Sequence, residues 1–170
     1  IVQANTGIET EVERMFEEVT SQLGKITGLV NNAGIHGPRG RLDDLKTDKI
    51  RAVLDTNILG YFLCSRSAIK CMSTKYNGDG GAIVNVSSGS AHIGAPNIGI
   101  LYAASKGAVN SLTIGLSQEV ASEGIRVNTV APGLTETDMP SREMLKQLGP
   151  KIPIGRVGQP EEIAEAITWL

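Results

Sequence analysis

Short apolar runs rich in β-branched residues alternate with helical segments along the whole chain, and this alternation constrains the fold more than any other feature. The runs that predict strands lie at 1–5, 26–30, 82–86 and 125–130. Segments between them carry apolar residues at helical spacing, which predicts crossover helices and therefore a parallel sheet with helices on its faces. At 170 residues, the chain is expected to form one domain over 1–170.

The helical segments show recognisable ends. A helix is predicted over 8–23, with Thr6 and Glu9 as a capping box and Gly24 as its end. A second is predicted from a cap at Thr47 and Asp48 to about residue 76, a third from about residue 102 to 123, and a last one from 160 onward. The proline-containing segment 134–155 is predicted to be a mobile lid.

The stretch 81–106 combines a predicted buried strand, a hydroxyl pair, a Gly-rich loop and a helix. Ser87 and Ser88 end the strand, at the edge where open α/β sheets bind ligands. Tyr102 and Lys106 stand four residues apart, on one face of the following helix. An ammonium beside a phenol favours the phenolate, so these groups could protonate a carbonyl or deprotonate an alcohol. The plainer alternative is a surface Tyr-Lys pair.

Asn57 interrupts the apolar face of the long predicted helix. A buried amide costs about 1 to 3 kcal/mol unless it is hydrogen-bonded. From the residue type alone, two interpretations stay open: a structural bond or a place in a site.

Composition excludes several classes of protein. The 16 basic and 18 acidic residues give a net charge of -2 and no basic run, which disfavours nucleic-acid binding. We see no apolar run of membrane-spanning length and no leader, so a cytoplasmic protein is expected. Cys64 and Cys71 lie seven residues apart in one predicted helix, about 10 Å, which is too far for a disulfide. With only His36 and His92, a metal site is not expected.

Five motifs in register resemble the short-chain dehydrogenase/reductase family. They are NNAG at 31–34, Asn57 in LDTNILG, NVSS at 85–88, YAASK at 102–106 and APGLTET at 131–137. The resemblance covers all 170 residues, and its details are most similar to glucose-dehydrogenase-like and uncharacterised bacterial oxidoreductase members. It implies a doubly wound Rossmann-type sheet in three α/β/α layers, incomplete at both ends, and hydride transfer between NAD or NADP and an alcohol or ketone.

The resemblance also implies residue roles. Tyr102 would be the general acid/base, Lys106 would lower its pKa and hold the nicotinamide ribose, and Ser88 would bond the substrate oxygen. Asn57 would hold a water that continues a proton relay. The implied cofactor contacts are Asn5 and Thr6 near adenine, Asn32, Ala33 and Gly34 along the ribose, and Pro132, Gly133, Thr135 and Thr137 around the nicotinamide. The implied substrate contacts are Ser88, His92, Tyr102 and Met139.

Two features depart from the family pattern. The spacing between Ser88 and Tyr102 is one residue longer than usual, so Ser87 and Ser90 stay open as alternatives to Ser88. The Gly-rich phosphate turn, the first two strands and the last strand of the family are absent, so the preference between NAD and NADP is unreadable. The missing strands would lie between 1–5 and 26–30, which predicts a gap in the sheet.

Other function classes and the assembly complete the expectations. A non-catalytic binding or scaffold protein on the same fold is the main alternative, and an isomerase or dehydratase is a third. The two long helices are expected to pair with their copies in a homodimer or homotetramer, as the family resemblance suggests. The residues that motivate this pairing are Ala103, Ala104, Ala108, Ser111, Tyr61 and Phe62.

Overall fold

The protein, described over residues 1–170 by a computed structural model, is built on three parallel strands. They are β1 (Gly28–Asn31), β2 (Gly81–Val86) and β3 (Ile125–Val130), in the order β1-β2-β3. Asn31 lies opposite Asn85 in the first pair, and Val86 lies opposite Val130 in the second. All three carboxyl ends therefore meet at one edge, as the strand and helix alternation predicts.

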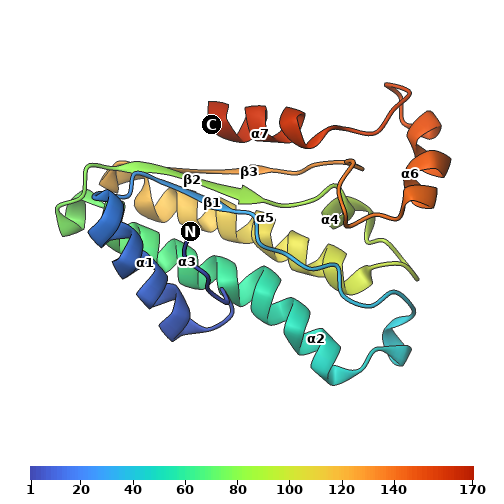
Figure 1. Ribbon diagram of the computed structural model, residues 1–170, viewed down its shortest axis with the longest axis horizontal. Coiled ribbons are helices and arrows are strands. Elements are labelled where there is room, and N and C mark those ends of the chain that lie inside the picture. The colour runs from blue at the N-terminus through green and yellow to red at the C-terminus, as the bar shows by residue number, and fades with distance from the viewer.

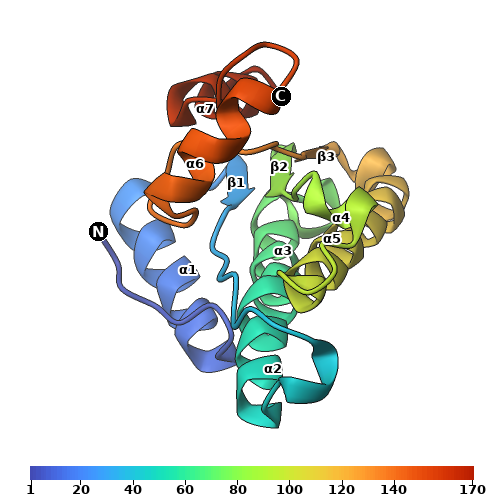
Figure 2. The ribbon, with the colours of Figure 1, turned by 90° about the vertical axis from the view of Figure 1, so that its right-hand side faces the viewer.

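Helices cover the sheet on both faces. Figure 1 shows α1, α3 and α5 below the sheet and α7 above it, and Figure 2 shows the same layers from the side. The predicted three-layer α/β/α order is present. The helices are α1 (Glu9–Leu23), α2 (Thr47–Leu54), α3 (Gly60–Met72), α4 (Ser90–Ile93), α5 (Ile100–Val120), α6 (Arg142–Leu148) and α7 (Pro160–Trp169).

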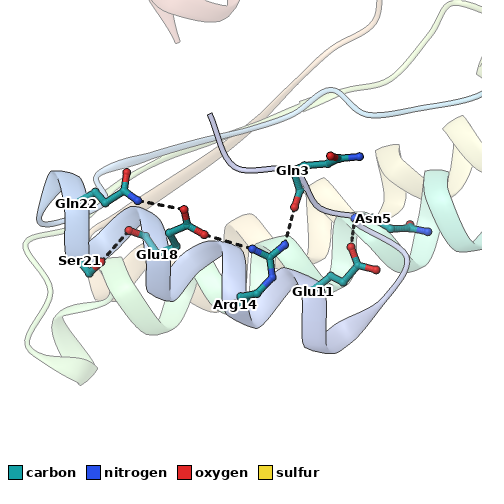
Figure 3. A network of polar contacts seen from close by, with 7 residues as sticks. All are labelled: Gln3, Asn5, Glu11, Arg14, Glu18, Ser21 and Gln22. Atoms are coloured by element: carbon teal, nitrogen blue, oxygen red, sulfur yellow. Dashed lines mark hydrogen bonds and ion pairs between the residues drawn. The ribbon is translucent and has the colours of Figure 1, made fainter.

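The segment 1–5 is not a strand, contrary to the prediction. A strand needs a hydrogen-bonded neighbour, and the sheet offers none to this segment. It lies instead along α1, where Arg14 donates to the Gln3 carbonyl at 2.6 Å and Glu11 accepts from the Asn5 N–H at 2.8 Å (Figure 3).

Of the three predicted helix starts, one is correct. The Thr6 and Glu9 box does not form, because α1 begins after Ile8 and no side chain caps it. The helix at Thr47 likewise has no side-chain cap. The last helix does begin at Pro160, with a capping box from Gln159 and Glu162. Gly24 ends α1 at a φ of 84°, which favours glycine.

The long helix predicted over 47–76 is four elements in the structure, two of them α-helices. A π-helical turn at Asp55–Leu59 separates α2 from α3, and a 3-10 turn at Thr74–Tyr76 follows. Asn57 lies inside the π-turn and is fully buried. π-turns widen the backbone locally and occur often at functional sites. The π-turn therefore favours a functional role for the region around Asn57.

The core lies between the sheet and the layer of α1, α3 and α5. Its eleven buried residues are Val12, Phe16, Leu63, Cys64, Ala68, Met72, Ile83, Leu116, Val120, Ile125 and Val127. β2 carries buried residues on both faces, whereas the buried and exposed residues of β3 alternate over its first half. On the other face, α7 covers the sheet only in part (Figure 1).

Cys64 and Cys71 are both free thiols. Among the helices, we find none with the length and apolarity that crossing a membrane requires.

A ladder of buried amides joins the strands to the helices behind them. Asn31 donates to the Ser65 hydroxyl at 3.0 Å and to Asn85 Oδ1 at 2.9 Å. Asn85 in turn donates to the Thr113 hydroxyl at 2.9 Å. Because every step crosses between two elements, the ladder fixes β1 and β2 against α3 and α5.

We predict that Asn85→Ala lowers the free energy of unfolding by at least about 2 kcal/mol, because Asn31 and Thr113 lose a buried partner and a cavity forms. Asn128→Ala, on β3 with no side-chain hydrogen bond, is the matched control. Denaturant unfolding of both variants measures the difference, and equal losses would contradict the structural role of the ladder.

Candidate active site

The loops that follow β2 and β3 are tied together at the carboxyl edge of the sheet. The Ser87 N–H donates to the Val130 carbonyl at 2.8 Å, and the Gly89 N–H donates to the Pro132 carbonyl at 2.9 Å. The start of α5 lies behind these loops, because the Ser87 hydroxyl donates to the backbone carbonyl of Lys106 at 3.1 Å. The hydroxyl pair after β2 and the start of α5 are therefore held together by a hydrogen bond.

Lys106 carries its ammonium into the protein, and only 2% of the residue is exposed. Its Nζ donates to the Val86 carbonyl at 2.7 Å and to the Tyr61 hydroxyl at 3.0 Å. Burial lowers the pKa of Lys106 from 10.5 to about 8. A charged amine in this position is costly, and the two acceptors offset part of that cost.

Tyr102 stands beside Lys106 and Ser88. Lys106 Nζ lies 5.8 Å from the centre of the Tyr102 ring. Burial raises the pKa of Tyr102 above the ordinary phenol value, and a side-chain hydrogen bond with Ser88 opposes that rise. The expected depression of the Tyr102 pKa by Lys106 is thus not what the protein groups alone produce, because desolvation dominates.

The three candidate serines have different partners. Ser88 is the one that influences the Tyr102 phenol, because it lowers the pKa that burial raises. The Ser87 hydroxyl is buried, and its proton is donated to the Lys106 carbonyl of α5. Ser90 meets Ser88 through its backbone N–H, at 3.1 Å from the Ser88 hydroxyl. The geometry favours Ser88 as the hydroxyl that shares a substrate oxygen with Tyr102.

Asn57 uses its side chain to bind the loop after β1. Its Oδ1 accepts from the Ile35 N–H at 2.8 Å, and its Nδ2 donates to the Ile35 carbonyl at 2.9 Å and to the Ser105 hydroxyl at 3.0 Å. Both amide protons are therefore used within the protein. The second lone pair of Oδ1 is the side-chain group left for the predicted relay.

Gly34 is where the loop after β1 passes over the ammonium. A Cβ built on Gly34 would lie 3.4 Å from Lys106 Nζ and 3.5 Å from Asn57 Oδ1. Asn32 and Ala33 precede it and are exposed. The backbone of the loop after β1 therefore runs directly beside the ammonium, and Gly34 places no side chain there.

The remaining predicted contacts lie around this centre at different depths. Thr6 packs against Gly60 beside the π-turn, since a Cβ on Gly60 would approach the Thr6 hydroxyl to 2.8 Å. Asn5 is exposed and borders an open cavity of about 670 Å³ along α1. Beyond β3, the Thr135 hydroxyl donates to the Gly133 carbonyl at 3.2 Å.

The predicted substrate contacts outside the centre, His92 and Met139, are exposed and make no side-chain hydrogen bond with it. The Met139 N–H bonds the Thr137 hydroxyl at 3.4 Å, within 134–155, and the Met139 side chain is exposed. His92, in α4, is exposed too. Neither His92 nor Met139 makes a side-chain hydrogen bond with the centre.

Three residues that sequence reasoning did not assign belong to the site. Tyr61 holds Lys106, Ser105 holds Asn57, and the ring of His36 stacks on Tyr102 with centroids 5.2 Å apart and planes at 19°. One signal was available, because Tyr61 stands four residues after Asn57 and therefore on the same helix face. The approach of His36 depends on a loop and has no periodic signal.

Comparisons with known proteins agree with this geometry. A family model described as enoyl-(acyl carrier protein) reductase matches residues 1–170. An uncharacterised oxidoreductase of Escherichia coli, YgfF, is 46% identical over 176 residues, which cover 100% of this chain and 70% of the relative. The chain belongs to the short-chain dehydrogenase/reductase family. The family resemblance of the motifs is therefore confirmed.

Other short-chain dehydrogenase/reductase relatives show the same extent of match. A 3alpha-hydroxysteroid dehydrogenase of Mediterraneibacter gnavus is 40% identical, over 94% of this chain and 63% of the relative. The crystal structure of a 3-ketoacyl-(acyl-carrier-protein) reductase from Brucella melitensis, complexed with NADH, superposes with a TM-score of 0.93 at 32% identity. That match covers 99% of this chain and 69% of the other. The Rossmann-type fold is thus confirmed, and the chain spans 63 to 70% of these three relatives.

We predict that Lys106→Met stabilises the protein at pH 7. Below about pH 8, Lys106 is protonated in both the folded and the unfolded chain, so the folded state bears the full cost of the buried charge. Between about pH 8 and 10.5 the folded chain gives up this proton first, and the cost fades. The shift corresponds to about 3 kcal/mol, and methionine fills a similar volume while Tyr61 still bonds the Val86 carbonyl.

Unfolding of wild type and variant at pH 7 and pH 10 measures this effect. The advantage of Lys106→Met should shrink at pH 10, and Lys70→Met, at an exposed position on the same layer, should show no such change. A variant that is less stable than wild type at pH 7, or equally displaced at both pH values, would refute the prediction.

Proposed function

We propose that the protein is an NAD(P)-dependent oxidoreductase that transfers a hydride between the nicotinamide cofactor and an alcohol or ketone. The observation that carries this proposal is the buried Lys106 ammonium 5.8 Å from the centre of the Tyr102 ring. Ser88 lies near enough to the same phenol to oppose the rise of its pKa. A hydroxyl pair of this kind can hold one substrate oxygen while a proton moves to or from it. Relatives named as dehydrogenases and reductases support the assignment.

Each residue of the centre has a distinct role. Ser88 donates a hydrogen bond to the substrate oxygen and orients it toward Tyr102. Tyr102 gives its proton to that oxygen during reduction and takes it back during oxidation. The Lys106 ammonium stabilises the phenolate, which Tyr102 becomes during reduction and starts from during oxidation. Asn57 holds a water that continues the proton relay. Through its bond with Ile35, it also fixes the loop beside the ammonium.

The residues at the carboxyl edge of the sheet fit a nicotinamide cofactor. Gly34 leaves the ammonium open to a ribose, and Asn32 and Ala33 are exposed beside it. When bound, the nicotinamide ring supplies the hydride acceptor or donor. Relatives with NADH and with NADP bound support either form. The further proposed contacts are Asn5 and Thr6 toward adenine, and Pro132, Gly133, Thr135 and Thr137 toward the nicotinamide end.

The substrate class is defined by its reacting oxygen. We assign Ser88 and Tyr102 to the reacting oxygen, and we keep His92 and Met139 as proposed lining residues. Relatives named for hydroxysteroid, ribitol and acyl-carrier-protein substrates share an alcohol or a ketone as the reacting group. The lid role of 134–155 is supported by its exposed residues and by its tie to Gly158, whose carbonyl accepts from Glu136 at 2.9 Å.

A non-catalytic scaffold is the alternative, and the buried amine argues against it. A buried charge at 2% exposure lowers the stability of the fold. A scaffold would gain nothing in return for that cost, whereas an enzyme would use the charge in its chemistry. An isomerase or dehydratase would use the same phenol but would show no net oxidation or reduction of the cofactor. A cytoplasmic location stays a prediction from composition.

We predict that Tyr102→Phe in the intact protein loses turnover by at least about 100-fold and binds cofactor nearly as well as wild type, because only the transferable proton is removed. Cofactor fluorescence titration and a panel of alcohols and ketones measure the two quantities. Retention of more than a tenth of the wild-type rate would show that Tyr102 is not the acid/base. Cofactor binding without turnover in the wild type would favour the scaffold.

We further propose that α3 and α5 pair with their copies in a dimer or tetramer. Three exposed apolar side chains lie on or beside these helices: Leu59 at 42%, Phe62 at 51% and Ile114 at 62%. Ala104 and Ser111 are exposed on α5 as well and permit close approach. The prediction is wrong for two of the residues expected at this interface, Ala103 and Tyr61, because both are buried within the chain.

We predict that Ile114→Glu shifts the solution mass of the intact protein toward the monomer, because a carboxylate would be buried against its copy. The matched control is Ile154→Glu, at a position 69% exposed outside these helices, which should leave the mass unchanged. Light scattering at micromolar concentration measures both. A monomeric wild type would contradict the proposed assembly.

A further inference from the structure

Tyr61, Lys106 and the Val86 carbonyl form a closed triangle of hydrogen bonds. Lys106 Nζ donates to Tyr61 Oη at 3.0 Å and to the Val86 carbonyl at 2.7 Å, while Tyr61 Oη donates to the same carbonyl at 3.0 Å. Tyr61 is 2% exposed, and Lys106 Nζ lies 5.0 Å from the centre of its ring. The Tyr61 hydroxyl therefore accepts from the ammonium and donates to the carbonyl that the ammonium also binds.

The triangle decides where the ammonium points. Lys106 Nζ has three protons, and two of them are directed at Val86 and Tyr61, on the buried side. Gly34, in the loop after β1, lies beside the ammonium as well, and a Cβ there would come within 3.4 Å of Nζ. The third proton is thus left for the carboxyl edge of the sheet, where we have proposed that the cofactor binds.

We propose that Tyr61 is a positioning residue that acts through Lys106: its hydroxyl aims the ammonium at the cofactor and keeps it charged. This inference rests on the proposed function, since it concerns how that same site is organised. Removal of the hydroxyl would leave the ammonium with one protein acceptor in a buried place. The lysine would then give up its proton more easily and sample other orientations.

The groups around Lys106 make Tyr61 its main polar partner besides the Val86 carbonyl. From α3, Tyr61 and Cys64 face this region, and burial raises the pKa of both, so both stay protonated and uncharged at neutral pH. From α5, Tyr102 faces it, with His36 of the loop after β1 stacked behind. The seven ion pairs of the structure involve other residues, so no carboxylate balances the Lys106 charge.

Tyr61→Phe in the intact protein tests the inference, because it keeps the ring and removes the hydroxyl. The loss of activity at high pH, which follows deprotonation of Lys106, should begin about one pH unit lower than in wild type. The Kd for NADH or NADPH at pH 8 should rise by about three-fold or more. The matched control is Tyr76→Phe at a half-exposed position, which should change neither quantity.

A double-variant cycle separates positioning from plain packing. If Tyr61 acts through Lys106, Tyr61→Phe should leave the cofactor Kd unchanged within about two-fold when Lys106 is already methionine. That background holds no buried ammonium, so it also supplies a variant that folds without the triangle. A lower melting temperature with an unchanged pH profile and Kd, or an equal Kd effect in both backgrounds, would overturn the inference.

The outcome for Tyr102→Phe keeps the two proposals distinguishable. If that variant retains more than a tenth of the rate, the assignment of Tyr102 fails, while the Kd cycle still decides whether Tyr61 positions Lys106. If Tyr102→Phe is inactive and the Kd cycle shows no coupling, the function stands and the role of Tyr61 is wrong.

Discussion

The buried ammonium of Lys106 is the interaction on which the arrangement of the centre depends. A charge that is removed from water costs several kcal/mol unless acceptors surround it. The acceptors come from two elements, the Val86 carbonyl at the end of β2 and the Tyr61 hydroxyl on α3. Because Lys106 itself is on α5, the sheet and both helices must meet within hydrogen-bond distance at one point. The bond from Ser87 to the Lys106 carbonyl fixes the same point from the backbone side.

Buried amides extend this precision into the rest of the fold. Asn57 joins the loop after β1 to α5, and the pair of Asn31 and Asn85 joins β1 to β2. An amide left unpaired in a low-dielectric interior is costly, so these contacts are satisfied only in one strand register. A slip of one residue between the strands would separate Asn31 from Asn85 and would displace the loop that carries Gly34. The register of the sheet and the geometry of the site are therefore set by the same side chains.

The sequence predicts the parts of the molecule that repeat and misses those that depend on distant neighbours. Periodicity was sufficient for the β2 and β3 strands, for α1 and α7, and for the common face of Tyr102 and Lys106. It failed at 1–5, where an apolar run has no neighbouring strand, and at Asn57, where a π-turn interrupts a helix whose apolar pattern runs on. Tyr61 looked like an interface aromatic because an apolar pattern does not reveal whether a phenol faces a partner subunit or a buried amine.

The electrostatics of the centre favour one protonation state. Burial raises the pKa of Tyr102 and lowers that of Lys106 to about 8, so at neutral pH the phenol holds its proton while the amine is still charged. A neutral phenol beside an ammonium is poised to protonate a carbonyl oxygen, which is the step that ketone reduction needs. Alcohol oxidation needs the phenolate instead, and Ser88 and Lys106 do not offset the burial of Tyr102. A bound oxidised nicotinamide would supply positive charge beside the phenol, and that charge would favour the phenolate that Tyr102 needs to take a proton from an alcohol.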